Sequence, residues 1–297
     1  MFWNVLIISF LSLLACLISV FINFGLLSTI FITKKWKKSE ELTVFYARFA
    51  IDVVFGISKF SDSANLLIVL VYYTGYQDFL NQHRNWIFYI SWPSINLITV
   101  RALLVFVITT DRTLAVYTPI QYHNYRKRIP NFLIFLLLIG FVLINNWVLW
   151  GYCNYQLMVP QGCIAFGCSA NMCYIKFWLA YEQVIYTLIA FTSIFLVLKL
   201  YIWNNCSKIA QKSQDLSRAN RLAVIDTFVI FTFDLLPATV TARLITLKFE
   251  QIGPVGSLCK SIGFLIEGVL VVMALKRKND VAMEKSSKSV TRSIVRV

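Results

Sequence analysis

Seven separate runs of apolar residues constrain this chain more than any other feature of its sequence. Each is roughly 20 to 30 residues long, and a helix of that length crosses the roughly 30 Å hydrocarbon core of a bilayer. A helix also satisfies its own backbone hydrogen bonds, as lipid requires. The sequence therefore predicts an all-α membrane protein, a seven-transmembrane helix bundle, with a basic tail over residues 276–297. The predicted spans are residues 5–32, 42–73, 86–110, 131–152, 174–203, 221–247 and 255–275.

The composition excludes an ordinary soluble domain. Hydrophobic residues make up 58% of the chain and charged residues 14%, and the mean hydropathy is +0.69. A soluble domain needs more polar residues to cover its core. The formal net charge of +14 would suggest a nucleic-acid partner in a soluble protein, but here the charge lies between the apolar runs. Basic loops beside spans are typical of contact with anionic lipid, so we expect the lipid bilayer, and no nucleic acid, as a partner.

Lysine and arginine are distributed very unequally between the two sides of the predicted bundle. The side that carries the tail has nineteen of them, whereas the other side has two, Arg84 and Lys248. Basic loops stay in the cytoplasm, so the prediction places the N-terminus outside and the C-terminus inside. The first run ends in Lys34 and Lys35 and has no charge before it, which favours a retained span over a cleaved signal peptide.

Four of the seven cysteines lie in the loop between the fourth and fifth spans: Cys153, Cys163, Cys168 and Cys173. In the predicted orientation this loop is extracellular, where disulfides persist. Four cysteines allow three pairings, and the sequence does not choose among them. A zinc site is the alternative, although no histidine lies near the four cysteines.

Charged residues inside the second span predict a polar interior. Arg48, Asp52, Lys59 and Asp62 fall on one helical stripe, which must face the bundle because lipid offers charges no partner. Arg48 and Asp52 are four residues apart and can pair along the helix. Asp52 and Arg101 both lie about 15 Å from the cytoplasmic ends of their spans, which predicts a bridge between them. The sequence leaves open whether the Asp52–Arg101 bridge only stabilises the bundle or also has a switching role.

The end of the third span carries a longer motif. Residues 111–122 read DRTLAVYTPIQY, which resembles the Asp-Arg-Tyr-Leu-Ala-Ile-x-x-Pro-Leu-x-Tyr stretch of rhodopsin-like G-protein-coupled receptors. Asn23 in the first span and Phe49–Asp52 in the second resemble other marks of that superfamily. Phe231 and Pro237 keep its spacing in the sixth span.

Other marks of the superfamily are lost. Asp234 and Leu235 stand where its Cys-Trp is usual, Glu267 lies in a seventh span without Asn-Pro-x-x-Tyr, and the top of the third span has no cysteine. This mixture resembles the nematode chemosensory serpentine receptors, class beta-c. The phrases that carry the resemblance are FYARFAID (45–52), RANRLA (218–223) and FDLLP (233–237).

The resemblance implies a chemosensory receptor in the plasma membrane of a sensory cell. It would bind a small molecule from the outer side and activate a heterotrimeric G protein, with no catalytic residue and no cofactor. Asp111, Arg112, Pro119 and Tyr122 would couple to the G protein, and Asn23, Arg48, Asp52 and Arg101 would form an intramembrane polar network. Phe231 and Pro237 would form a hinge in the sixth span, for which a static proline kink is the alternative.

The residues of the ligand pocket are predicted only from how deep they lie within their spans. Candidates in the outer half are Trp92, Asn96, Tyr181, Glu182, Arg243 and Glu267. Glu182 and Glu267 would suit a cationic ligand, or would instead pair with Lys176 and Lys260.

Two other classes of function compete with reception. A transporter or ligand-gated channel could use the charged spans, through Lys59, Asp62 and Arg101. However, no repeated halves are visible in the sequence. A metal-dependent hydrolase would need ligands from His83 and His123, which the predicted orientation places on opposite sides of the membrane, so we expect no metal.

Overall fold

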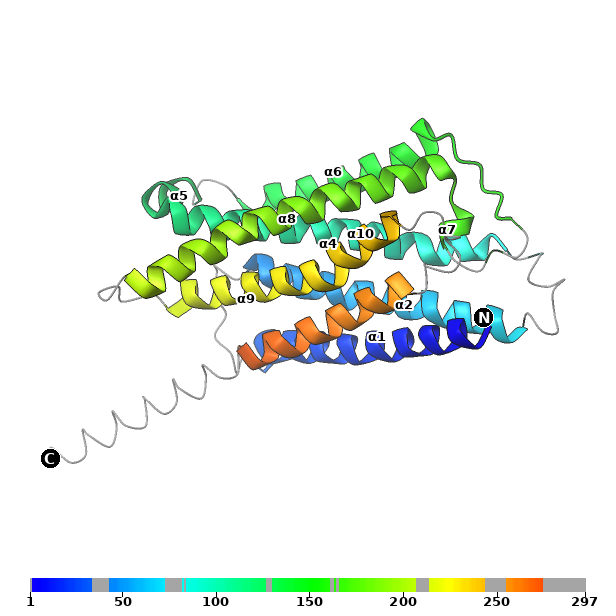
Figure 1. Ribbon diagram of the computed structural model, residues 1–297, viewed down its shortest axis with the longest axis horizontal. Coiled ribbons are helices and arrows are strands. Elements are labelled where there is room, and N and C mark those ends of the chain that lie inside the picture. Colours follow the sequence, from blue (N-terminus) through cyan, green and yellow to red (C-terminus); the bar gives the residue numbers. More distant parts are fainter. Residues whose placement is uncertain are drawn as a thin grey trace, which may run out of the picture.

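The computed structural model describes residues 2–33, 43–72, 82, 84–126, 130–160, 163, 166–206, 214–243 and 255–274. Within these ranges the chain is all-helical and its long helices run side by side in one elongated bundle (Figure 1). The predicted tail, residues 276–297, and residues 244–247 of the predicted sixth span lie outside the described residues. The elements are α1 (Phe2–Phe31), α2 (Thr43–Tyr72), α4 (Trp86–Tyr117), α5 (Pro119–Arg126), α6 (Asn131–Trp147), the π-helical η2 (Val148–Tyr152), α7 (Phe166–Ser169), α8 (Met172–Cys206), α9 (Gln214–Ile230), the π-helical η3 (Phe231–Leu235), α10 (Leu236–Arg243) and a last helix, Val255–Ala274.

Six stretches of the described helices are long and apolar enough to cross a membrane: Leu6–Phe31, Trp86–Tyr117, Asn131–Tyr152, Met172–Ile202, Asn220–Val240 and Val255–Ala274. The 30-residue α2 is not among them. It carries the four charged residues of the predicted polar stripe. The all-α class expected from the sequence is confirmed.

The central helix of the bundle is α4. It packs against α2, α6, α8 and α9, and half of its most apolar window is buried, against a third or less in the other five candidate spans. It continues as a helix past the predicted end of the third span at residue 110, as far as Tyr117. Asp111 and Arg112 therefore lie within α4, and their side chains pair with each other.

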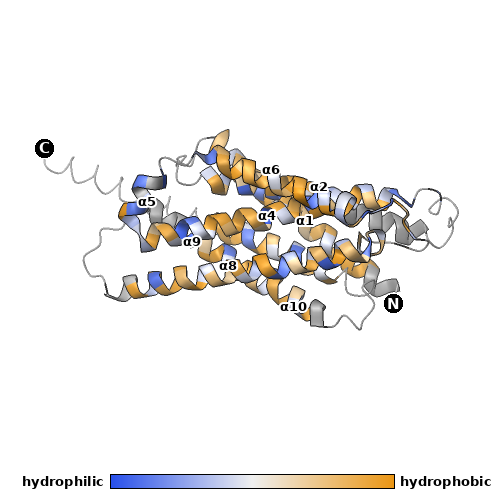
Figure 2. Ribbon diagram, turned by 90° about the horizontal axis from the view of Figure 1, so that it is seen from above, coloured by the Kyte–Doolittle hydropathy of each residue, from blue (hydrophilic) through white to orange (hydrophobic). Residues whose placement is uncertain are grey.

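The outer faces of the helices are apolar, as a lipid-facing surface requires. Phe21, Phe132 and Phe191 are more than half exposed, and orange ribbon dominates the long helices in Figure 2. In contrast, several fully buried side chains are charged: Arg48, Arg101, Asp226, Asp234 and Glu267. A soluble protein shows the opposite arrangement. The chain therefore has an apolar outside and a charged interior.

The two ends of the bundle differ. The start of α1 and the short α7 lie at one end, and α5 lies at the other (Figure 1). We call these the α7 end and the α5 end. The motif of residues 111–122 lies at the α5 end, and the cysteine-rich loop lies at the α7 end.

Candidate functional site

The first candidate site lies at the α5 end, where Arg112 is almost fully buried at 5% exposure. Its Nη2 lies 2.5 Å from Asp111 Oδ2 and donates to the Tyr122 hydroxyl oxygen at 3.3 Å. The Tyr122 hydroxyl donates to the Asp111 carboxylate, at 2.9 Å from Oδ1. A further cation, Arg126 of α5, places its Nε 3.1 Å from Asp111 Oδ1. Asp111 therefore holds two guanidinium groups and one phenol together.

Pro119 creates this arrangement by turning the chain. The α4 helix ends at Tyr117, and the backbone N–H of the capping residue Thr118 still bonds to Leu114 O at 2.9 Å. Proline has no N–H to continue the helix but suits the first position of a new one. The α5 helix begins at Pro119 and brings Tyr122 back beneath the end of α4. The motif residues Asp111, Arg112, Pro119 and Tyr122 thus lie together.

The Tyr122 hydroxyl stays protonated in this cluster. Burial raises the pKa of Tyr122 to about 12, and the negative charge of Asp111 acts in the same direction, while Arg112 opposes it. The phenol is therefore a hydrogen-bond donor throughout the physiological pH range.

A second site lies deep in the bundle, and we call it the central ion cluster: Arg48 and Asp52 of α2, Arg101 of α4, Asp226 of α9, and Glu267 of the last helix. Arg48 pairs with Asp226, with Glu267 and, at 3.4 Å, with Asp52. Arg101 Nε donates to Asp52 Oδ1 at 2.6 Å, and its Nη2 donates to Glu267. Its guanidinium carbon also lies 4.0 Å from the centre of the Phe264 ring. The Asp52–Arg101 pair expected from helix depth is present, as part of this larger cluster.

The central ion cluster carries an unbalanced charge. Two arginines face three carboxylates, and every member is at most 7% exposed. Removing ions from water costs several kcal/mol each, and close partners offset that cost only when geometry and further hydrogen bonds are good. Because Asp52 and Glu267 each contact both arginines, the cluster acts as one unit. Four separate helices meet at it.

Asn23 lies near this cluster, and its amide is hydrogen-bonded within its own helix, α1. Its amide donates to Ser19 O at 3.1 Å, one turn back on α1, and the side chain is buried. The adjacent position on the last helix is Gly268, whose missing Cβ would lie 3.7 Å from the Asn23 amide nitrogen. Asn23 therefore lines the contact between α1 and the last helix, next to Glu267.

The sixth span changes its winding at the predicted hinge. Residues Phe231–Leu235 form one π-helical turn, in which the Leu236 N–H bonds to Phe231 O. Pro237 follows, and a proline cannot donate to the carbonyl four residues earlier. A wide turn before a proline is a recurrent site of helix bending. Phe231 is half exposed on the outer face, whereas Asp234 points inward and is 2% exposed.

Two predicted pocket residues, Trp92 and Asn96, belong to an amide network that joins α4, α6 and α8. Trp92 Nε1 donates to Asn146 Oδ1 at 3.1 Å, and Asn145 Nδ2 donates to Asn96 Oδ1 at 2.9 Å. The Tyr174 hydroxyl completes it by donating to Asn145 Oδ1 at 2.9 Å. These bonds tie the three helices together.

The other predicted pocket residues do not lie together at one depth in the bundle. Tyr181 donates to Thr99 O at 3.0 Å. Glu182 accepts a hydrogen bond from Lys260 at 2.5 Å. Glu267 lies deeper, in the central ion cluster. Arg243 ends α10, and its side chain lies outside the described residues.

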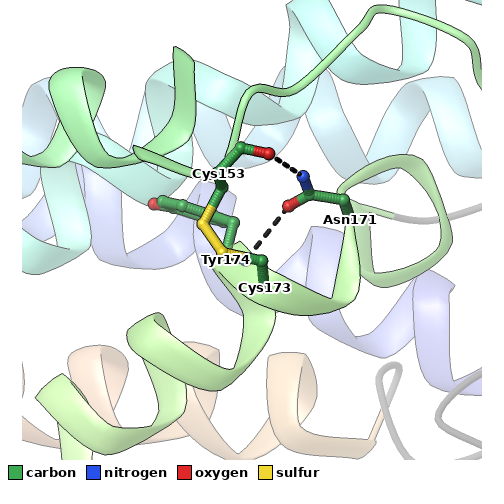
Figure 3. The surroundings of a disulfide bond; sticks show 4 residues. All are labelled: Cys153, Asn171, Cys173 and Tyr174. Carbon is green, nitrogen blue, oxygen red and sulfur yellow. Dashed lines mark hydrogen bonds between the residues drawn. A yellow bond between two sulfur atoms is a disulfide. The ribbon is translucent and has the colours of Figure 1, made fainter. Parts of the chain in front are cut away.

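The four loop cysteines form two disulfides, Cys153–Cys173 and Cys163–Cys168. The first fastens the end of η2 to the start of α8, and Asn171 reinforces it (Figure 3). The Asn171 amide donates to Cys153 O at 2.9 Å, and its oxygen accepts the Tyr174 N–H at 3.0 Å. The pairing left open by the sequence is thereby decided.

Sequence reasoning missed Asp226 as a cluster member, and it treated Asp234 only as a departure from a motif. A signal for Asp226 existed in the helical period. Leu222, Ala223, Val229 and Ile230 share the buried face of α9 with it. A carboxylate on the buried face of an apolar span requires a cationic partner.

Residues 1–279 match the family model described as the serpentine type 7TM GPCR chemoreceptor Srbc. No curated protein matches the chain. The family is a seven-transmembrane one, and α2 is the remaining long helix of the described residues beside the six apolar stretches. Its members are receptors rather than enzymes. The match spans nearly the whole chain, and the protein therefore belongs to the Srbc family of serpentine seven-transmembrane chemoreceptors.

Proposed function

We propose that this protein is a G-protein-coupled chemosensory receptor of the plasma membrane, with its N-terminus outside and its C-terminus in the cytosol. It binds a small molecule from the outer side and activates a heterotrimeric G protein at the α5 end. The observation that carries the proposal is the buried Arg112, held by Asp111 and Tyr122 at the end of the central helix. Family membership supports the same reading.

The orientation draws support from two features at opposite ends. Both disulfides lie at the α7 end, and disulfides persist on the oxidising, extracellular side. The lysine and arginine excess lies in segments attached to the α5 end. An epitope tag at the N-terminus should bind antibody on intact cells, and a C-terminal tag should do so only after permeabilisation. The reverse pattern would contradict the orientation.

The coupling is tested with a G-protein activation reporter and a panel of small odorants and metabolites. Arg112→Ala should abolish a ligand response of the wild type at matched surface level. Lys199→Ala is the matched control, because it also removes a cation near the α5 end, one whose Nζ lies 5.3 Å from the centre of the Tyr117 ring. A ligand-evoked ionic current that survives Arg112→Ala, without G-protein activation, would instead establish a channel.

A further inference from the structure

A second group of charges, two of them buried and one partly buried, lies between the central ion cluster and the α7 end. It consists of Glu182 on α8, Asp234 in η3 and Lys260 on the last helix, and we call it the outer charge group. Lys260 precedes Glu267 by seven residues, or about 10 Å along the helix, and Asp234 follows Asp226 by eight, or about 12 Å. Both displacements point toward the α7 end. The interior therefore holds two layers of charge at different depths.

The outer charge group already holds one ammonium group, which belongs to the chain itself. Lys260 Nζ donates to Glu182 Oε1 at 2.5 Å. It lies 5.3 Å from the centre of the Trp178 ring and 5.9 Å from that of Tyr186. Aromatic faces within about 6 Å attract cations. Carboxylate and rings together form surroundings that suit an alkylammonium.

Asp234 is the member with unused acceptor capacity. It is 2% exposed, and its Oδ1 accepts no hydrogen bond from any residue that the structure describes. The charged groups whose fields act on its carboxylate are Lys260, Arg101, Glu182 and Arg48. Lys260 is bonded to Glu182, however, and Arg101 to Asp52 and Glu267. A buried polar atom without a partner is costly and rare, and it requires an explanation.

The charges of the outer group do not balance. The group has two carboxylates and one ammonium, and the ammonium pairs with Glu182, which leaves the negative charge of Asp234 in surroundings of low dielectric constant. A positive ligand would neutralise the group, and a negative one would double its charge. A bare metal ion is a poor fit, since the described ranges contain no group of three His, Cys, Asp or Glu side chains placed to hold one.

We infer that the ligand is a small organic cation, a protonated amine whose N–H donates to Asp234 beside the rings of Trp178 and Tyr186. The inference rests on the proposed receptor function and specifies its ligand class. It uses the open Oδ1 acceptor, the excess of negative charge and the aromatic walls that already surround the Lys260 ammonium. The Lys260–Glu182 ion pair stays intact when the amine binds and contributes to the net charge of the site.

The test measures binding to purified full-length receptor in lipid nanodiscs, without a G protein. The probes are amines, alcohols and carboxylates with matched carbon skeletons: butylamine, butanol and butyrate, then phenethylamine, phenethyl alcohol and hydrocinnamate. Thermal shift and calorimetry should show saturable binding of the amines, and much weaker binding of the alcohols and carboxylates.

Two substitutions should change amine affinity in opposite directions. Asp234→Asn removes the excess negative charge and should weaken amine binding about ten- to hundredfold. Lys260→Met leaves two unopposed carboxylates and should strengthen it. Lys176→Met is the matched control, because Lys176 lies on the same outer part of α8 as Glu182 but is exposed. It should leave the affinity unchanged.

Several results would overturn the inference: no amine binding to folded wild type, carboxylate binding in place of amine binding, or amine affinity unchanged by Asp234→Asn. If thermal unfolding without ligand shows that Asp234→Asn does not fold, Lys260→Met still tests the inference. An amine affinity that does not rise in Lys260→Met would then overturn it. Amine affinity that falls in Asp234→Asn and rises in Lys260→Met, without any G-protein activation by the amine, would support the inference and contradict the proposed function.

Discussion

Arg48 of α2 and Asp226 of α9 form an ion pair in the middle of the bundle, where Arg48 is 1% exposed and Asp226 is not exposed at all. The other members of the central ion cluster belong to α2, α4 and the last helix. The Arg48–Asp226 pair therefore ties the sixth span to three others at mid-depth. Any movement of α9 away from the bundle has to break this pair or carry Arg48 with it.

The charge excess of the central ion cluster predicts unequal costs for removing its members. Arg48→Met would leave three carboxylates facing one arginine, and we expect it to lower the free energy of unfolding by roughly 3–5 kcal/mol. Asp226→Asn would leave two carboxylates facing two arginines and should cost much less. Thermal unfolding of the purified receptor, together with surface expression, measures the difference. Equal losses for the two variants would show that net charge does not limit the stability of the cluster.

The Arg48–Asp226 ion pair also predicts a change in signalling. If the sixth span moves during activation, Asp226→Asn should favour the moved state and raise ligand-independent G-protein activation. Asp226→Glu keeps the charge and should stay near wild type. A reporter assay at matched surface level makes the comparison. Unchanged basal activity in Asp226→Asn would mean that the pair is structural only.

The two disulfides should differ in importance. Cys153–Cys173 closes a segment with a sequence separation of 20, and Cys163–Cys168 one with a separation of 5. Chain-entropy estimates give about 3 kcal/mol for the longer loop and about 2 kcal/mol for the shorter. The longer one also anchors the start of α8, so Cys153→Ser should reduce thermal stability and surface delivery more than Cys163→Ser does. A larger loss from Cys163→Ser would contradict this ranking.

Tyr122 should restrain Arg112 through its hydroxyl. Tyr122→Phe removes a donor to Asp111, worth about 1 kcal/mol, and should raise basal G-protein activation by up to about fivefold. Tyr117→Phe is the matched control at the same end of the bundle, since that hydroxyl donates to Phe195 O instead, and it should change basal activation less. Equal effects of the two substitutions would refute a specific role.

The pKa of Tyr122 gives this contact a defined pH dependence. The folded-state pKa, about 12, lies above the ordinary 10.0, so the neutral phenol is stabilised by folding. That contribution is complete below the ordinary value and is lost as pH rises toward about 12. We therefore expect no change from Tyr122 ionisation in the physiological range. Absorbance at the tyrosinate band should show a delayed component in the wild type that is smaller by one tyrosine in Tyr122→Phe.

Part of the site could be predicted because it depends on local order along the chain. The polar stripe of α2 follows from the helical period, and the depth of Asp52 and Arg101 follows from counting residues from the span ends. The partners Asp226 and Glu267 could not be predicted in the same way. They lie 178 and 219 positions after Arg48 in the numbering, and their meeting depends on how each helix is rotated about its axis. The inward direction of Asp234 also depends on the π-helical turn that contains it.

The sequence by itself determined the all-helical membrane class, the polar interior of the second span and the cluster of cysteines in one loop. These are properties of single segments, fixed by hydrophobic length, helical period and position along the chain. The tertiary structure alone decided the cysteine pairing, the five-residue central ion cluster and the open acceptor of Asp234. These depend on which faces of separate helices meet, and that is set by the packing of the whole bundle.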